Sequence, residues 1–490
     1  MRNLLTEPLC EAQDLGKPIA DSMHAVSVCL PLWEHVVGYE EGDPAVVEAM
    51  WCGYPRFVMH PQLEELHQRL LTDHGQTGER CLSFCDQSAA QRCLKFLNGE
   101  GRVLAIHEDS LAACFFPERH YALACQYRRH TGEIVSSRQA DAFLKSQLVE
   151  PAEDAELLIR KRLADWNGQE LEDVFLYGNG MAAHYHLHRA IQSGLGGGSS
   201  IQFGFPYVDI LKVQQKFPPG VDFIWDNGAA GFDQLKQRLE QGNVMAVYAE
   251  LPNNPLLSMP DCLRLKELCQ NHQVPLLVDD TVGSYANVDS FRIADVTYSS
   301  LTKYFNGACD AMGGTVMINA DSPYREQIRA ALREAGGDGL YGEDAVVLEA
   351  NSRNYPERMA QMNQTTETLA EFLQGHPKVA RVYHPKLQDN TCYEAIRKEG
   401  GGYGGLLSIE LVNPETNAPA FYDKLRLNKG PTLGTNFSLA CPYTLLAHYD
   451  ELEWAESCGV SRWLIRISIG LEPEDEIISR FAEALAAVEL

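Results

Sequence analysis

An alternation of short apolar strands and helices from residue 171 onward constrains the fold of this chain most. The expected strands are short, apolar and rich in β-branched residues. This pattern predicts a mostly parallel sheet covered by helices on both faces, with ligands bound beyond the carboxyl ends of its strands. The expected strands are Val174–Tyr177, Ile201–Phe203, Val221–Trp225, Val244–Ala249, Pro275–Val278, Asp295–Tyr298 and Gly314–Ile318.

The rest of the chain divides around this pattern. We predict an N-terminal arm over residues 1–70 that makes oligomer contacts, interrupted by prolines and extended over its first 60 residues. A large α/β domain is expected over residues 71–345, with an elaboration at 83–170 that contains helices at Ala89–Leu97 and Ala140–Leu148. A smaller α/β domain follows over 346–490, with strands at Val379–Tyr383, Leu406–Leu411 and Trp463–Ile469 and a last helix from Pro473. No internal repeat is visible.

Polar residues follow several of the expected strands. Glu250 and Asn254 come after one strand, Asp279 after the next, and Ser300, Thr302 and Lys303 after another. Gly180 and Met181 open a helix directly after Val174–Tyr177. One crevice therefore collects an acid, a lysine with neighbouring hydroxyls, an asparagine and a helix N-terminus.

This set matches what pyridoxal phosphate requires. A lysine bonds to its aldehyde, a carboxylate keeps its ring nitrogen protonated, and hydroxyls with helix-end N–H groups bind its phosphate. A dinucleotide site is an alternative, because Gly178-x-Gly180-x-x-Ala183 follows a strand. No acidic residue ends the next strand, however, which disfavours this reading. We interpret His184, His186 and His188 as packed histidines and predict no metal site.

Several runs resemble the pyridoxal-phosphate enzymes of cysteine and methionine metabolism, and among them the fungal-type cystathionine γ-synthases. The runs are Gly38–Asp43, Gly53–Phe57, Glu250–Pro255, Val278–Thr281, Ser300–Gly307, Leu433–Tyr449 and Arg466–Glu472. The resemblance implies an aspartate-aminotransferase-like fold, that is, fold type I of the pyridoxal-phosphate enzymes. It also implies a homodimer or homotetramer with active sites shared between subunits.

The resemblance also implies residue roles. Lys303 is the lysine that bonds the cofactor and acts as base, and Asp279 is the partner of the ring nitrogen. Arg466 binds the substrate carboxylate, a task that suits a bidentate guanidinium. Tyr54 and Arg56 match an arm motif that reaches a neighbouring subunit's phosphate. The other expected residues are Gly180, Met181, Ser300 and Thr302 at the phosphate, Asn254 near the ring oxygen, and Thr432 and Phe437 at the substrate.

Two residues depart from the family pattern. Phe203 stands where relatives have a tyrosine that stacks on the cofactor and assists catalysis. Phenylalanine can stack but cannot transfer a proton, so Tyr207 is the candidate for the missing catalytic hydroxyl. Phe437 stands where many relatives have a glutamate that helps to select the substrate. Both departures concern the choice of substrate and leave the cofactor chemistry intact.

Composition limits the partners and the compartment. The chain has 41 basic and 67 acidic residues and a net charge of −26, which opposes binding to nucleic acid. No apolar run is long enough for a membrane span, and the acidic residues in Met1–Lys17 do not fit a targeting peptide. The scattered cysteines are typical of buried reduced thiols. We therefore expect a cytoplasmic enzyme that acts on a small amino acid.

Three functions are compatible with these observations. The first is γ-substitution, in which cysteine or another nucleophile adds at Cγ of an O-acylhomoserine-like amino acid. The second is γ-elimination of another leaving group, such as a halide. The third is a scaffold without cofactor, which the joint presence of Lys303, Asp279 and Arg466 disfavours.

Overall fold

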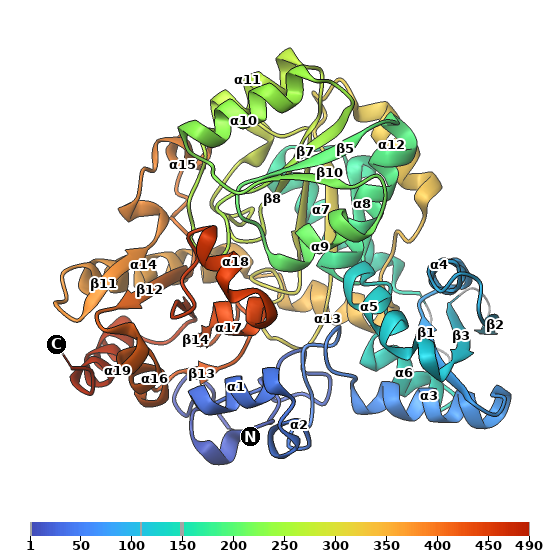
Figure 1. Cartoon of the computed structure of the whole chain (residues 1–490), viewed down its shortest axis with the longest axis horizontal. Helices are drawn as coiled ribbons and strands as arrows, with labels where there is room; N and C mark the ends of the chain where they lie inside the picture. Colours follow the sequence, from blue (N-terminus) through green and yellow to red (C-terminus); the bar gives the residue numbers. More distant parts are fainter. Residues whose placement is uncertain (1, 108–109, 148–150, 490) are drawn as a thin grey trace.

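A seven-stranded sheet, called the large sheet below, lies in the upper centre of the molecule (Figure 1). The structure is a computed structural model that describes residues 2–107, 110–147 and 151–489. The order of the strands is β4-β10-β9-β8-β7-β5-β6, and only β10 runs antiparallel to its neighbours. The strands are β4 (Val174–Tyr177), β5 (Ser199–Phe203), β6 (Val221–Ile224), β7 (Val244–Glu250), β8 (Leu276–Asp279), β9 (Val296–Ser300) and β10 (Gly314–Ile318). The predicted parallel sheet is confirmed, with strand ends moved by at most two residues.

Helices cover both faces of the large sheet, which explains why its strands are apolar throughout rather than alternating. In β4, Phe175 and Tyr177 pack under α8, whereas Val174 and Leu176 pack on the opposite face against α7. Helices α10 and α11 cover the face formed by β5, β7 and β8. The helices of this region are α7 (Glu153–Asn167), α8 (Gly180–Leu195), α9 (Val208–Lys216), α10 (Ala229–Glu240), α11 (Cys262–Asn271), α12 (Arg325–Ala335) and α13 (Gly342–Asn351).

The elaboration contains a separate three-stranded antiparallel sheet, called the N-terminal sheet below, in the order β1-β3-β2. It lies at the right of Figure 1, on the opposite side of the molecule from the C-terminal helix α19. The expected helix at Ala140–Leu148 ends at Leu144, and Leu148 lies outside the described residues. The elements are α3 (Pro61–His74), β1 (Glu79–Phe84), α4 (Gln87–Phe96), β2 (Arg102–His107), β3 (Leu111–Pro117), α5 (Tyr121–Thr131) and α6 (Ser137–Leu144).

A five-stranded sheet forms the C-terminal part, in the order β11-β12-β15-β14-β13. Strands β13 and β14 were not expected from the sequence, because one has two residues and the other ends in a proline. The strands are β11 (Val379–Tyr383), β12 (Leu406–Leu411), β13 (Asn428–Lys429), β14 (Leu439–Pro442) and β15 (Ile465–Ser468). The helices are α14 (Tyr355–Gln374), α15 (Thr391–Ile396), α16 (Pro414–Lys424), α17 (Tyr443–His448), α18 (Leu452–Ser457) and α19 (Glu474–Ala486).

The first 50 residues differ from the expected extended arm. They contain helices α1 (Trp33–Glu41) and α2 (Pro44–Val47), and Pro44 takes the first position of α2. Trp33 and Val36 are buried in the core of the C-terminal sheet, with Phe421 and Ile467. Ordering this segment as helices costs chain entropy. Burial of the apolar face of α1 offsets that cost, which explains why the segment is not an extended arm.

The cysteines also differ from the expectation of reduced thiols. Cys262 of α11 and Cys392 of α15 form a disulfide, so the expectation is wrong for this pair. Most of the remaining cysteines are buried free thiols. No helix in the described part of the chain is long and apolar enough to cross a membrane.

A buried ion pair joins α6 to α13. Arg138 Nη1 lies 2.8 Å from Asp344 Oδ1 and also donates to the Asp310 carbonyl, and both charged side chains are buried. We predict that Arg138→Met lowers the free energy of unfolding by about 3–5 kcal/mol, because Asp344 is then a buried charge without a partner. Urea unfolding followed by circular dichroism measures this effect.

The matched control is Arg69→Met, which removes the exposed i, i+4 pair with Asp73. We expect this change to cost less than about 1 kcal/mol. Equal losses in the two variants would contradict a structural role for the α6–α13 pair.

Candidate active site

A cavity of about 970 Å³ opens at the carboxyl ends of the large-sheet strands. It lies where parallel strands place their following loops, as expected for this class of sheet. Ten of the predicted site residues line it: Tyr54, Arg56, Gly180, Met181, Tyr207, Asn254, Asp279, Ser300, Lys303 and Arg466. Residues far apart in the sequence therefore meet in one place.

Lys303 follows β9, and a hydrogen bond from its amino group fixes the end of its side chain. Its Nζ donates to Thr432 Oγ1 at 3.0 Å and lies 4.6 Å from the centre of the Tyr54 ring. Burial alone would raise the pKa of Tyr54, but the nearby charges of Lys303 and Arg56 lower it below its ordinary value. The phenol of Tyr54 is thus a readily ionised group next to the amine.

Asp279 ends β8 and presents a buried carboxyl to the cavity. The Thr281 N–H donates to its Oδ1 at 2.9 Å, and no ion pair to Asp279 is formed within the described residues. Burial raises the pKa of Asp279 to about 6. A buried carboxylate without a cationic partner is costly, and a protonated ring nitrogen placed in the cavity would supply that partner.

The N-terminus of α8 forms another wall of the cavity. Asn179 caps the helix, since its Oδ1 accepts the Ala182 N–H at 3.0 Å. A Cβ at Gly180 would lie 2.7 Å from the Ser300 Cβ, so only glycine allows the helix to start this close to β9. The first N–H groups of a helix have no helical acceptor and favour an anion such as phosphate.

Arg56 lies inside the cavity of its own chain and is almost fully buried. Its guanidinium forms an ion pair with Asp209 at 2.7 Å and donates to the Tyr207 hydroxyl at 2.9 Å. Burial favours the neutral acid, but Arg56 holds the pKa of Asp209 well below its ordinary value. Burial raises the pKa of Tyr207, so its hydroxyl stays protonated.

Arg466 of β15 lines the cavity from the C-terminal sheet. It donates to Asn254 Oδ1 at 3.2 Å and to the carbonyls of Pro431 and Thr432. None of the described carboxylates forms a salt bridge with it, although it is only 4% exposed. A buried guanidinium bound only to neutral groups is suited to an incoming carboxylate.

Four predicted residues are not part of the cavity lining: Phe203, Phe437, Thr302 and Thr432, although the Thr432 hydroxyl accepts from Lys303. Phe203 packs in the core under α10, with its ring 5.0 Å from that of Phe232. Phe437 packs against the N-terminal residues in a separate core. The Thr302 hydroxyl is bonded to the backbone of Gly313, where it ties the lysine loop to β10.

The sequence analysis assigned no individual role to several residues of the cavity. Glu250 ends β7, its Oε2 accepts the Tyr207 N–H at 2.6 Å, and burial followed by the charge of Asp279 raises its pKa well above the ordinary value. Tyr443 and His448 of α17 also line the cavity. The position of Glu250 directly after a parallel strand was an available signal, and α17 lies within the run Leu433–Tyr449 that carries the family resemblance.

The cavity residues fit pyridoxal phosphate. Lys303 is an amine for its aldehyde, Asp279 lacks the cation that its ring nitrogen provides, and the α8 N-terminus with Ser300 and Arg56 provides donors for its phosphate. When bound, this cofactor acts as an electron sink for negative charge next to its imine carbon.

Comparisons with known proteins agree with this reading. Residues 157–486 match the family model of Cys/Met metabolism PLP-dependent enzymes. Residues 62–136 match the model of the N-terminal domain of fungal trans-sulfuration enzymes. The predicted cofactor and the predicted family are therefore confirmed.

Similar curated proteins span nearly the whole chain. A cystathionine γ-synthase of Neurospora crassa is 33% identical, with 97% of this chain and 98% of that protein covered. An L-2-amino-4-chloropent-4-enoate dechlorinase/desaturase of Streptantibioticus cattleyicolor is 30% identical, with 96% and 97% covered. These relatives are consistent with the prediction of a transferase or lyase acting at Cγ.

Solved structures confirm the predicted fold class. A cystathionine γ-synthase of Xanthomonas oryzae pv. oryzae in complex with cystathionine has a TM-score of 0.60 and 23% identity, and covers 68% of this chain and 86% of its own. The protein named metB of Corynebacterium glutamicum has a TM-score of 0.59 and 25% identity, with 67% and 84% covered. The chain belongs to the pyridoxal-phosphate-dependent enzymes of cysteine and methionine metabolism, in their fungal trans-sulfuration type.

Proposed function

We propose that this enzyme catalyses γ-substitution, in which cysteine or another nucleophile replaces the acyloxy group at Cγ of an O-acylhomoserine-like amino acid. One observation carries the proposal: Lys303 and Arg466 line the same cavity, and both donate to Thr432, the amine to its hydroxyl and the guanidinium to its carbonyl. An amino acid whose carboxylate is bound by Arg466 thereby presents its Cα and side chain to the amine. The relationship to the Neurospora crassa cystathionine γ-synthase supports the substrate class.

Each cavity residue has a role in this proposal. Lys303 removes the Cα proton and then a Cβ proton, since its amine ends a flexible side chain and lies between the Thr432 hydroxyl, to which it donates, and the Tyr54 ring. Tyr54 accepts or returns a proton at Lys303, because its lowered pKa makes the phenolate accessible. Tyr207 is hydrogen-bonded to Arg56 and Asp209, and it is the aromatic residue that takes the role expected at Phe203.

Glu250 fits the same scheme as a neutral acid. Its raised pKa keeps it protonated, so it adds no second negative charge next to Asp279. Asp279 can then be the single anion that faces the ring nitrogen. Two ionised carboxylates at this place would repel each other in a site from which water is excluded.

A γ-elimination that expels a halide is the second candidate. The dechlorinase/desaturase of Streptantibioticus cattleyicolor, which is 30% identical over nearly all of this chain, favours it. A panel of γ-substituted amino acids, with and without added thiols, separates the two functions by mass spectrometry. Products that contain the thiol support substitution, whereas keto acid and ammonia formed equally without a thiol would support elimination.

The lysine is tested by Lys303→Ala. We predict that this variant loses the visible absorbance of the covalently bound cofactor and all measurable turnover, because no other amine in the described residues takes the place of Lys303 in the cavity next to Thr432. Lys212→Ala is the control, since Lys212 lies at the cavity rim in a pair with Glu451. Wild-type absorbance in Lys303→Ala would rule out the assigned role.

The role of Arg466 in binding the substrate carboxylate is tested by Arg466→Ala. We predict a rise in KM that lowers kcat/KM roughly ten- to hundred-fold, the value of a charge-assisted hydrogen bond. Arg466→Lys should recover only part of this loss, because ammonium cannot form the bidentate contact. An unchanged KM in Arg466→Ala would contradict the assignment.

The pH dependence of cofactor binding tests Asp279. The pKa of Asp279 is raised to about 6 in the protein without cofactor, so its carboxylate is lost as the pH falls through this value. We expect cofactor affinity to fall about tenfold per pH unit below about pH 6, because one proton must then leave Asp279 on binding. Equilibrium dialysis measures the affinity.

Asp279→Asn is the matched variant for this measurement. It should bind the cofactor more weakly at every pH and lack the inflection assigned to Asp279, since asparagine does not titrate. A wild-type affinity that does not change between about pH 5 and 7 would show that Asp279 is not the titrating partner.

A further inference from the structure

Two parts of the chain form the same series of elements. Helix α3, strand β1 and helix α4 correspond to α7, β4 and α8, with an offset of 93 residues. For example, α3 ends at His74 and α7 at Asn167, and α4 begins at Gln87 and α8 at Gly180. Without any gap, eight residues are identical between the two parts: Arg69/Arg162, Leu70/Leu163, Gly75/Gly168, Gln76/Gln169, Glu79/Glu172, Ala89/Ala182, Ala90/Ala183 and Leu94/Leu187. The sequence alone did not reveal this repeat.

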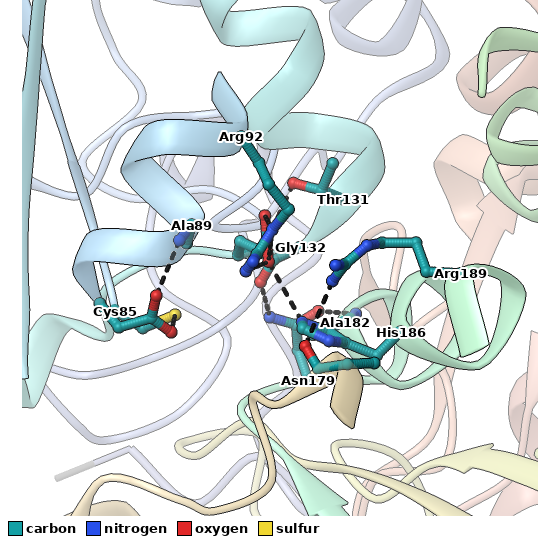
Figure 2. Close-up of polar contacts among 12 residues, drawn as sticks. Cys85, Ala89, Arg92, Thr131, Gly132, Asn179, Ala182, His186 and Arg189 are labelled. Atoms are coloured by element: carbon teal, nitrogen blue, oxygen red, sulfur yellow. Dashed lines mark hydrogen bonds and ion pairs between the residues drawn. The ribbon is translucent and has the colours of Figure 1, made fainter. Parts of the chain in front are cut away.

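The local geometry of the two parts agrees. In the first part, Asp86 Oδ1 accepts the Ala89 N–H at 2.7 Å and caps α4. In the second part, Asn179 Oδ1 accepts the Ala182 N–H at 3.0 Å and caps α8. The two helix starts lie on either side of Gly132 in Figure 2. In each part, the cap stands two residues after the strand and three residues before the first of two alanines.

The order of the strands repeats as well. The N-terminal sheet has the order β1-β3-β2, and the large sheet begins with β4-β10-β9. In both, the middle strand is antiparallel to its two neighbours. The helix after the middle strand, α5 or α12, has 11 residues in each case and ends at a glycine with positive φ, Gly132 or Gly336. Helices α6 and α13 then follow.

The first part has lost what a cofactor site requires. Gln87 stands at the position of Gly180, and it is exposed. Strand β2 ends at His107 and β3 begins at Leu111, so the connection is too short for a counterpart of the Lys303 loop between β9 and β10. The described residues of this part contain no counterparts of β5, β6, β7 and β8 either. This part therefore has the framework of the large domain without its chemistry.

The two parts pack on one another through buried polar contacts. Arg138 of α6 pairs with Asp344 of α13 at 2.8 Å. Glu133, which is fully buried, pairs with Arg92 of α4 and lies 3.2 Å from His186 Nε2 of α8. Arg92 and His186 approach this point from the two parts in Figure 2. Asn179 Nδ2 also donates to the Gly132 carbonyl at 2.7 Å, directly at the start of α8.

The segment before the first part enters the cavity of the second. Tyr54 and Arg56 precede α3 by a few residues, and they reach Lys303 and Tyr207 of the same chain. Arg128 of α5 holds this segment, because its guanidinium donates to the carbonyls of Pro55 and Arg56. The first part thus positions two residues of a site that lies in the second.

We propose that residues 54–144 are an internal, degenerate copy of the large domain that takes the place of a partner subunit and completes the active site within one chain. Arg56 then supplies a guanidinium to the cofactor phosphate, and Tyr54 stands beside Lys303, without a second chain. The shared sites of a dimer or tetramer, which the family resemblance implies, are not needed here. The inference rests on the proposed roles of Lys303 and Arg56.

Mixing two inactive variants tests the proposal. Arg56→Ala keeps Lys303, and Lys303→Ala keeps Arg56. The two chains carry different tags and are produced together in one cell. One sample is purified through both tags in turn, and a second sample is the total pool of both chains. If sites were shared, each mixed dimer would have one intact site, and the pool would regain about a quarter of the wild-type activity for random pairing. We expect no activity above the sum of the separate variants.

Cofactor binding gives a second readout that does not depend on turnover. We expect Arg56→Ala to bind pyridoxal phosphate more weakly than wild type, and we expect the same weak binding after Lys303→Ala chains are added. The visible absorbance reports this binding, because only chains with Lys303 bond the cofactor covalently. Arg69→Ala, which changes an exposed arginine of the internal copy, should bind as wild type.

Restored cofactor affinity or activity in the mixture would overturn the proposal. Failure of the proposed reaction is distinguishable from this outcome. A wild-type enzyme that binds pyridoxal phosphate but does not convert O-acylhomoserines would disprove the proposed substrate, and the absorbance of the mixture would still decide whether the site is completed in one chain.

Discussion

The structure depends on keeping acidic and basic side chains buried together at the carboxyl edge of one sheet. Asp279 and Glu250 end neighbouring strands, and Lys303 and Arg466 line the same cavity. Burying such groups costs several kcal/mol each unless a partner compensates for the lost water. Three other parts of the chain serve this arrangement: the helices exclude water from the sheet, the C-terminal sheet carries Arg466, and the N-terminal part supplies Arg56.

The sequence predicted the large sheet well because its strands are buried on both faces, so each strand reads as an apolar run of a characteristic length. The residues that follow these strands, Asp279 and Lys303 among them, could be assigned to one site because parallel strands gather their carboxyl ends. Phe203 shows the limit of this reasoning. It aligns with a cofactor-stacking residue, yet it packs under α10, since alternate residues of a strand point to opposite faces. Only the structure shows that Tyr207 faces the cavity instead.

The N-terminal half was harder to predict for a different reason. Its repeat retains the pattern of burial and capping but few identities, because Asp86 and Asn179 cap equally well and different apolar residues fill equivalent cores. The prediction of an extended arm was wrong at α1, where Trp33 is buried in the core of the C-terminal sheet. Such contacts connect residues hundreds of positions apart, and nothing in a local stretch of sequence marks them.

The contact between α6 and α13 has an evolutionary consequence. In a symmetric dimer, every substitution at the interface occurs twice, so a surface must remain complementary to itself. Arg138 and Asp344 instead stand on two unlike helices of one polypeptide. Either side can change charge or shape alone while the other adapts. Apart from Tyr54 and Arg56, the N-terminal part is then free to change as a scaffold. Joining both halves in one gene also fixes their ratio and keeps the assembly intact at any dilution.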